Sequence, residues 1–143
     1  MTNFDLCEVA DFGNMKNISI FIVERNPVWG NLLKYRLACN KYTNTRLFLS
    51  PGEALRQIEG NIIPDYIIAS DFRDANKFLS SVKATDHSIG VIFFTETGDS
   101  EKAEKLLVAG AADYIVRSGN SESGVKELIK NLKYLCREEY IFR

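Results

Sequence analysis

Short, almost continuously apolar segments alternate along the chain with longer segments whose apolar residues recur at helical spacing. A strand buried on both faces of a sheet shows no apolar–polar alternation, so these short runs predict central parallel strands. Strands that alternate with helices indicate one doubly wound α/β domain, with helices on both faces of a five-stranded parallel sheet. The predicted strands are residues 18–23, 46–49, 66–70, 91–95 and 114–116.

The predicted helices begin and end at residues that favour helix termini. Asn26 and Ser50 each precede a proline, which combines a capping side chain with proline at the first helical position. Gly110 follows the helix predicted over about 100–109, where glycine is the preferred terminating residue. The remaining helices are predicted over about 51–58, over 75–82 and around Val125 to Leu135. In the first helix we expect one apolar face, consisting of Val28, Leu32, Tyr35 and Cys39 and widened by Leu33 and Leu37.

Length and composition are those of one soluble globular domain, because the chain has 143 residues, of which 45% are hydrophobic and 26% charged. A net charge of -1 argues against direct binding of nucleic acid. Apolar runs are too short to cross a membrane. Residues 1–14 lack both helical periodicity and a secretory signal, so we expect an N-terminal extension over 1–14 and a folded domain over 15–143.

Cysteine and histidine usage points to a reducing compartment without a zinc site. The three cysteines are widely spaced and form no CxxC pair, which favours a cytoplasmic protein with buried thiols. His87 is the only histidine, so local spacing assembles no tetrahedral ligand set.

Polar residues follow the predicted strands at the points where each strand ends. The carboxyl ends of parallel strands meet at one edge of the sheet, where α/β proteins bind their ligands. We therefore expect one polar cluster at this edge. Its candidate members are Glu24, Arg25, Ser70, Asp71, Thr95 and Arg117.

The segments IFIVERNP, PDYIIASD, VIFFTET and AGAADYIVRS, between about residues 17 and 135, resemble the receiver domains of bacterial response regulators, which act in two-component phosphorelay signalling. The resemblance implies a flavodoxin-like fold similar to the chemotaxis regulators, with strand order 2-1-3-4-5. In that family an acidic pair follows the first strand, a phosphate-accepting Asp ends the third, and a Lys-Pro follows the fifth. Thr95 and Tyr114 match the family's switch pair of a hydroxyl and an aromatic residue.

The departures from the family pattern fall on the phosphorylation chemistry. Ser70 stands at the acceptor position, and Asp71 comes one residue late. Glu24 retains the first acid, whereas Arg25 replaces the second and Arg117 replaces the lysine. A serine hydroxyl cannot form the acyl phosphate on which the family's chemistry depends. The chain therefore resembles an atypical receiver, or pseudo-receiver, with a degenerate site.

An arginine beside the metal position opposes the binding of Mg²⁺. Two charges about 4 Å apart interact by roughly 4 kcal/mol at a surface-like dielectric, so Arg25 would repel the ion. Its guanidinium could instead occupy the metal's place by pairing with Glu24 or Asp71. We therefore expect no enzymatic activity, no cofactor and no metal; if a metal binds, Glu24 and Asp71 would hold Mg²⁺.

The resemblance implies signal transduction through protein–protein contacts, with a histidine kinase or an effector as partner. The implied contact surface is the fourth helix, fifth strand and fifth helix, including Glu101, Tyr114 and Val125, through which receivers also form homodimers. One alternative is a phosphorylatable switch in which Glu24 and Asp71 hold Mg²⁺ and Arg117 contacts the phosphate. A second is a flavodoxin-like protein that binds a small ligand, although no glycine-rich phosphate loop follows the first strand.

Overall fold

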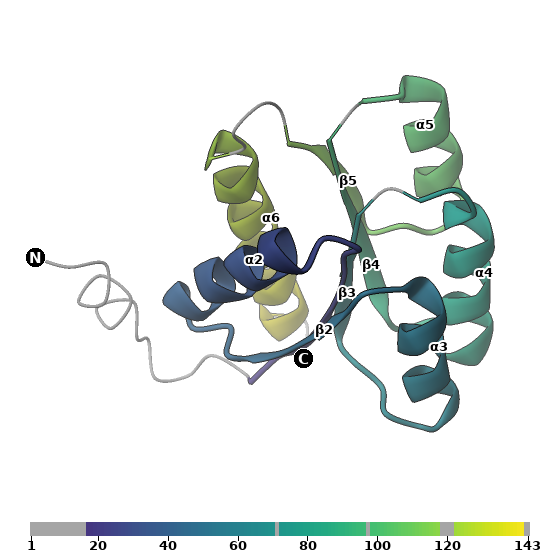
Figure 1. The fold of residues 1–143 in the computed structure, drawn as a ribbon, viewed down its shortest axis with the longest axis horizontal. Helices are drawn as coiled ribbons and strands as arrows, with labels where there is room; N and C mark the ends of the chain where they lie inside the picture. The colour runs from purple at the N-terminus through teal and green to yellow at the C-terminus, as the bar shows by residue number, and fades with distance from the viewer. Residues whose placement is uncertain (1–16, 71, 97, 118–121, 142–143) are drawn as a thin grey trace, which may run out of the picture.

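The computed structural model describes residues 17–70, 72–96, 98–117 and 122–141, with side chains as far as residue 136. The described residues form a five-stranded parallel sheet of order β2-β1-β3-β4-β5, which confirms the predicted fold class. Figure 1 shows the sheet between α2 and α6 on one face and α3, α4 and α5 on the other. The expected boundary after residue 14 lies outside the described residues. The elements are β1 (Ser19–Val23), α2 (Pro27–Cys39), β2 (Asn44–Phe48), α3 (Pro51–Glu59), β3 (Tyr66–Ala69), α4 (Ala75–Thr85), β4 (Gly90–Thr95), α5 (Ser100–Val108), β5 (Asp113–Val116) and α6 (Glu122–Ile141).

The helix starts predicted from capping residues are confirmed. The Asn26 side chain accepts hydrogen bonds from the backbone N–H groups of Val28 and Trp29 at 3.0 and 3.2 Å. The Ser50 hydroxyl accepts the N–H of Glu53 at 3.4 Å. These bonds satisfy N–H groups that have no partner inside the first turn of a helix, so short local sequences fix where α2 and α3 begin.

Strand β2 was predicted about two residues too late. Its residues Asn44 to Phe48 pair with Ser19 to Val23 of β1, and Leu49 lies beyond the strand with 45% of its surface exposed. The first two residues of β2, the exposed Asn44 and the buried Thr45, are both polar and give no hydrophobic signal. Pairing with β1, rather than the apolar pattern, therefore sets the bounds of β2.

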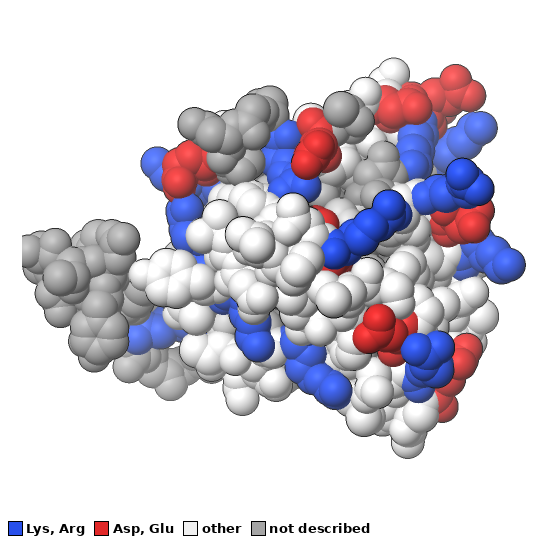
Figure 2. Space-filling model, viewed as in Figure 1, with Lys and Arg blue, Asp and Glu red and all other residues white. Residues whose placement is uncertain are grey.

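The predicted buried face of α2 was partly wrong. Gly30, Leu33 and Leu37 are its buried residues, whereas Val28 and Leu32 are 78% and 48% exposed. Tyr35 is also exposed, and the surface over α2 in Figure 2 is largely uncharged. Since this helix carries apolar residues on both sides, periodicity alone could not identify the side that faces the sheet.

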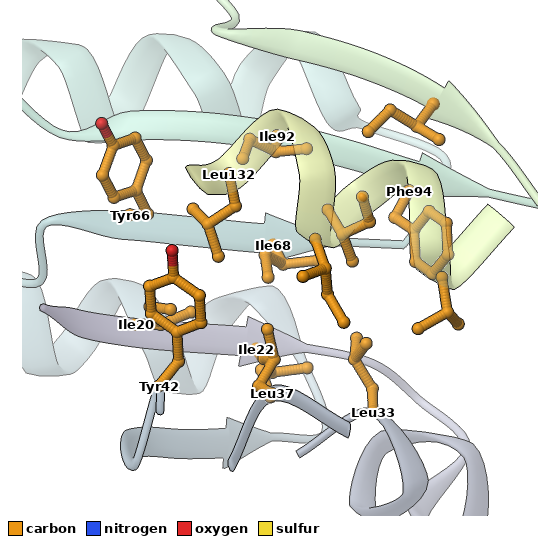
Figure 3. Packing of buried hydrophobic residues seen from close by; sticks show 14 of the residues in the cluster. Ile20, Ile22, Leu33, Leu37, Tyr42, Tyr66, Ile68, Ile92, Phe94 and Leu132 are labelled. Atoms are coloured by element: carbon orange, nitrogen blue, oxygen red, sulfur yellow. The ribbon is translucent and has the colours of Figure 1, made fainter. Parts of the chain in front are cut away.

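Each face of the sheet carries its own hydrophobic core. Ile20, Ile22 and Ile68 point towards α2 and α6 and pack with Leu33 and Leu132 (Figure 3). The alternate residues of the same strands pack beneath α3, α4 and α5. Successive strand side chains point to opposite faces, so the two cores also decide on which side of the sheet each residue beyond a strand end lies. None of the helices in the described ranges has the length and apolar character needed to cross a membrane.

Candidate functional site

Glu24 is a buried carboxylate directly after β1. Only 6% of its surface is exposed. Buried carboxylates in proteins are almost always paired with another group. Its Oε2 atom accepts the backbone N–H of Asn26 at 2.9 Å, which places the carboxylate beside the start of α2. Its Oε1 atom is buried and has no hydrogen-bond partner among the described residues. A negative charge held in this way requires a nearby positive charge.

Arg117, directly after β5, supplies that positive charge. Its backbone N–H donates to the Thr95 carbonyl at 2.7 Å, which holds residue 117 against the end of β4. The Nη2 atom lies 3.8 Å from Glu24 Oε1 and 3.2 Å from Glu96 Oε1. Strands β5 and β1 are three strand spacings apart, or about 14 Å, so the long arginine side chain bridges most of that width.

Trp29 covers the guanidinium. The Cζ atom of Arg117 lies 4.1 Å from the centroid of the Trp29 ring and 5.8 Å from that of Phe94. Trp29 also stacks on Phe94, with ring centroids 6.3 Å apart. Only 10% of the Arg117 side chain is exposed. A cation over an aromatic face is stabilised by about 0.5–2 kcal/mol, and exclusion of water strengthens its attraction to Glu24.

Helix α6 closes the site through Gly124. A Cβ atom at residue 124 would lie 2.8 Å from the Cα atom of Arg117 and 3.6 Å from the Phe94 ring. Real Cβ atoms do not approach backbone atoms so closely, so only glycine permits this packing. On the same side, Arg36 of α2 forms an ion pair with Glu122 of α6 at 2.6 Å. The start of α6 is thus held against both Arg117 and α2.

The expectation that Arg25 pairs with Glu24 was wrong. Arg25 is exposed, and the guanidinium beside Glu24 belongs to Arg117. The physical reason is the alternation of side chains: Glu24 and Arg117 lie two residues beyond Ile22 and Ile115, which both face α2 and α6. Pairing of Arg25 with Asp71 stays a prediction, because Asp71 lies outside the described residues.

The other predicted residues occupy different positions around the same edge. The Ser70 hydroxyl donates to the Val23 carbonyl at 3.3 Å, immediately beyond the end of β3. Thr95 ends β4 and is 1% exposed. Thr95 lies two residues after Phe93 in β4, so their side chains point to the same face of the sheet. Phe93 is paired with Tyr114 of β5, and both pack in the core beneath α3, α4 and α5. Thr95 and Tyr114 therefore lie on that face. The structure therefore separates this pair from Glu24 and Arg117.

The described residues do not fit a magnesium site. Mg²⁺ requires oxygen ligands in near-octahedral geometry, whereas Glu24 supplies one carboxylate that faces a guanidinium. Within the described ranges, no group of three or more His, Cys, Asp or Glu residues could hold a metal ion. What the arrangement provides is a fixed internal ion pair beneath an aromatic cover.

Sequence reasoning missed the contributions of Trp29 and Gly124. Trp29 was not among the predicted site residues, although its place in the first turn after Asn26 puts it at the same edge of the sheet as Glu24. Gly124 carried no signal, because its role depends on the distance between α6 and β5. Glu96 directly follows β4, and the strand-end rule that identified the other candidates identifies this residue as well.

The implied contact surface on α5, β5 and α6 needs one correction. Val125 is 3% exposed and packs in the core with Leu128 and Ile129, so it is not available to a partner. Glu101 is exposed as expected. The exposed apolar residues on this side are instead Leu107, Val108 and Val116, with exposures of 45%, 82% and 38%.

Comparison with known proteins gives similarity at the level of fold. No family model and no curated protein matches the chain. A response regulator receiver domain protein from Methanospirillum hungatei is similar with a TM-score of 0.76 and 20% identity, covering 90% of this chain and 100% of that one. An orphan response regulator of H. pylori is similar with a TM-score of 0.69 and 22% identity, covering 82% and 94%.

An atypical orphan response regulator, whose structure revealed a phosphorylation-independent regulatory mechanism, is also similar. The TM-score is 0.71 and the identity 22%, covering 84% of this chain and 96% of that one. The chain therefore has the flavodoxin-like fold of response-regulator receiver domains.

Proposed function

We propose that this protein is an atypical receiver domain that transmits a signal through protein contacts without phosphorylation of an aspartate. Receiver domains are generally signalling modules rather than enzymes. The observation that carries the proposal is the ion pair between Arg117 and Glu24, covered by Trp29. One of the structures similar in fold is that of an atypical regulator with a phosphorylation-independent mechanism.

Charge explains why the ion pair and phosphorylation are incompatible. In the family that this chain resembles, the acid after the first strand helps to hold Mg²⁺, and the position of Arg117 carries a lysine that contacts the phosphate. Here one guanidinium neutralises that acid and is itself held by Glu24, Glu96 and Trp29. To recruit Mg²⁺, the protein would have to break a buried pair, which costs about 3–5 kcal/mol. The cation proposed at the metal position is thus Arg117 rather than Arg25.

Treatment with acetyl phosphate and Mg²⁺ followed by intact-mass measurement tests this proposal. We expect no added phosphate. Thermal unfolding with beryllium fluoride and Mg²⁺ gives an independent readout, because a ligand at 100 times its Kd stabilises the native state by about 2.7 kcal/mol. For a domain of this size that corresponds to a rise in Tm of several degrees, and we expect none.

Substitution of Asp71 or Ser70 distinguishes phosphorylation of a specific acceptor residue from nonspecific phosphorylation by the reagent. If the chain gains phosphate and Asp71→Ala abolishes the gain while Ser70→Ala does not, the alternative of a phosphorylatable switch using Glu24, Asp71 and Mg²⁺ is correct and our proposal is wrong. A preparation that releases a nucleotide or flavin on denaturation would instead support the small-ligand alternative.

We place the partner contact on the surface formed by α5 and β5. Leu107 and Val108 at the end of α5 and Val116 at the end of the edge strand β5 are exposed apolar residues. A cytoplasmic signalling protein, or a second copy of this chain, is the proposed occupant. Light scattering of the chain and of Leu107→Glu/Val108→Glu tests the homodimer, with Leu32→Glu on the exposed side of α2 as control. A dimer abolished by the first variant alone supports this surface; a dimer lost in the control assigns it to α2.

A further inference from the structure

An open groove between α2 and α6 is strongly basic. Its volume is about 600 Å³, and Ile129 and Tyr134 form its apolar wall. Tyr134 is 63% exposed, although tyrosine usually buries most of its ring. The positively charged residues that line the groove are Arg36, Lys126, Lys130 and Lys133.

The three lysines of this groove lie on one side of α6. Positions 126, 130 and 133 are four and three residues apart, which brings their side chains together on a helix. Like charges at this spacing destabilise a helix. Arg36 already pairs with Glu122, whereas no ion pair joins these lysines to a carboxylate within the described residues. A negatively charged occupant would therefore relieve repulsion within α6.

The chain itself carries a segment of matching composition. Residues 1–16 contain three acids, Asp5, Glu8 and Asp11, and a single basic residue, Lys16. Phe4 and Phe12 stand on either side of the acids. Three carboxylates with flanking aromatic residues complement three lysines with an apolar wall.

The described chain begins on the same side of the sheet as the groove. Asn17 is exposed, and Ile18 packs in the core cluster that also contains Ile129 and Cys136 of α6. Sixteen residues reach up to about 50 Å when extended. The radius of gyration expected for a domain of this size is about 14 Å, so the groove lies within reach. A short tether gives an effective concentration of the order of mM, so weak contacts suffice.

We propose that the acidic segment of residues 1–16 binds in the basic groove between α2 and α6 of the same molecule. Binding covers Tyr134 and neutralises Lys126, Lys130 and Lys133. Because the attraction is electrostatic, high salt should release the segment. This inference does not depend on the state of the Glu24–Arg117 pair.

A nitroxide attached to Cys7 tests the proposal in the full chain. Cys136 is buried, and Cys39→Ser removes the other described thiol. In the ¹⁵N-labelled, spin-labelled protein we expect the amides of Lys126, Lys130 and Lys133 to lose most of their intensity at low salt. They should regain it near 1 M salt, where the screening length falls to about 3 Å. Unbroadened groove amides at low salt would overturn the proposal.

Charge reversal provides the matched variants. Lys126→Glu/Lys130→Glu/Lys133→Glu should abolish the broadening, as should Asp5→Lys/Glu8→Lys/Asp11→Lys, and the two sets combined should restore it. The control Lys77→Glu/Lys105→Glu changes exposed lysines on α4 and α5, across the sheet, and should leave the broadening intact. Failure of the combined set to restore broadening would show that charge pairing is not the cause.

Mixing distinguishes the segment of the same molecule from that of a second copy. When ¹⁵N-labelled protein without nitroxide is mixed with unlabelled, spin-labelled protein, we expect no broadening. Broadening in the mixture would assign the groove to the segment of another molecule and overturn the proposal as stated.

Discussion

The guanidinium carbon of Arg117 lies 4.1 Å from the centre of the Trp29 ring, although residue 117 follows the last strand and residue 29 belongs to the first turn of α2. This contact joins the first helix to the end of the last strand, across the carboxyl edge of the sheet. It places the cation 3.8 Å from Glu24 and shields both charges from water. Trp29 is the only tryptophan, so its fluorescence reports directly on this site.

Removal of Arg117 should destabilise the fold, whereas removal of Arg25 should not. Arg117→Ala leaves Glu24 buried without its cation, and we expect the free energy of unfolding to fall by about 3–5 kcal/mol. Arg25→Ala removes an exposed arginine from the same edge and should change it by less than about 0.5 kcal/mol. Urea unfolding monitored by Trp29 fluorescence measures both. Equal losses in the two variants would mean that Arg117 has no special role.

Two double-mutant cycles should show that burial outweighs distance in the ion pairs. The Glu24–Arg117 pair is 3.8 Å long with side chains 8% and 10% exposed, and the Arg36–Glu122 pair is 2.6 Å long with side chains 26% and 56% exposed. We expect a coupling energy of about 1–3 kcal/mol for the first pair. For the second we expect less than about 1 kcal/mol, because water screens exposed charges.

Salt dependence is the internal control for these cycles. Coupling between Arg36 and Glu122 should vanish at high salt, whereas coupling between Glu24 and Arg117 should persist, since buried pairs are screened much less. The reverse order at any salt concentration would contradict the proposed burial of the Glu24–Arg117 pair.

A methyl group at residue 124 should disturb the site from α6. In Gly124→Ala the new Cβ atom meets the backbone of Arg117, so α6 or residue 117 has to move. We expect a loss of about 1–2 kcal/mol from overpacking, even though alanine favours a helix more than glycine does. A change in Trp29 fluorescence should accompany it.

Gly52→Ala is the matched control for this substitution. Its Cβ atom would meet only the end of the Arg56 side chain, at 3.9 Å, and we expect unchanged or slightly higher stability with an unchanged Trp29 spectrum. If both variants behave alike, close packing of α6 against Arg117 is not what residue 124 provides.

Removal of the Tyr114 hydroxyl should not weaken the domain. This hydroxyl is buried and has no hydrogen-bond partner among the described residues. Tyr114→Phe removes an unsatisfied polar group, so the free energy of unfolding should stay the same or rise by up to about 1 kcal/mol. A loss of more than 1 kcal/mol in urea unfolding would show that the hydroxyl has a partner outside the described residues.

Local sequence accounts for most of the secondary structure. Asn26 and Ser50 determine helix starts through hydrogen bonds that span two or three residues, and these were predicted from neighbouring residues alone. Strand β2 was displaced because its residues Asn44 and Thr45 join the sheet by pairing with β1, which is a nonlocal interaction. The inner side of α2 was misassigned for the same reason, since contact with the sheet selects between two apolar sides.

The sequence by itself determined the α/β alternation, the helix caps and the set of polar residues that reach the carboxyl edge of the sheet. Only the tertiary structure decided which arginine lies against Glu24. Strands buried on both sides are apolar throughout, so their sequences do not show which face each residue points to. The side of the sheet on which Arg25 and Arg117 lie is fixed by how α2 and α6 pack, and that packing directs Arg117 under Trp29 and leaves Arg25 in solvent.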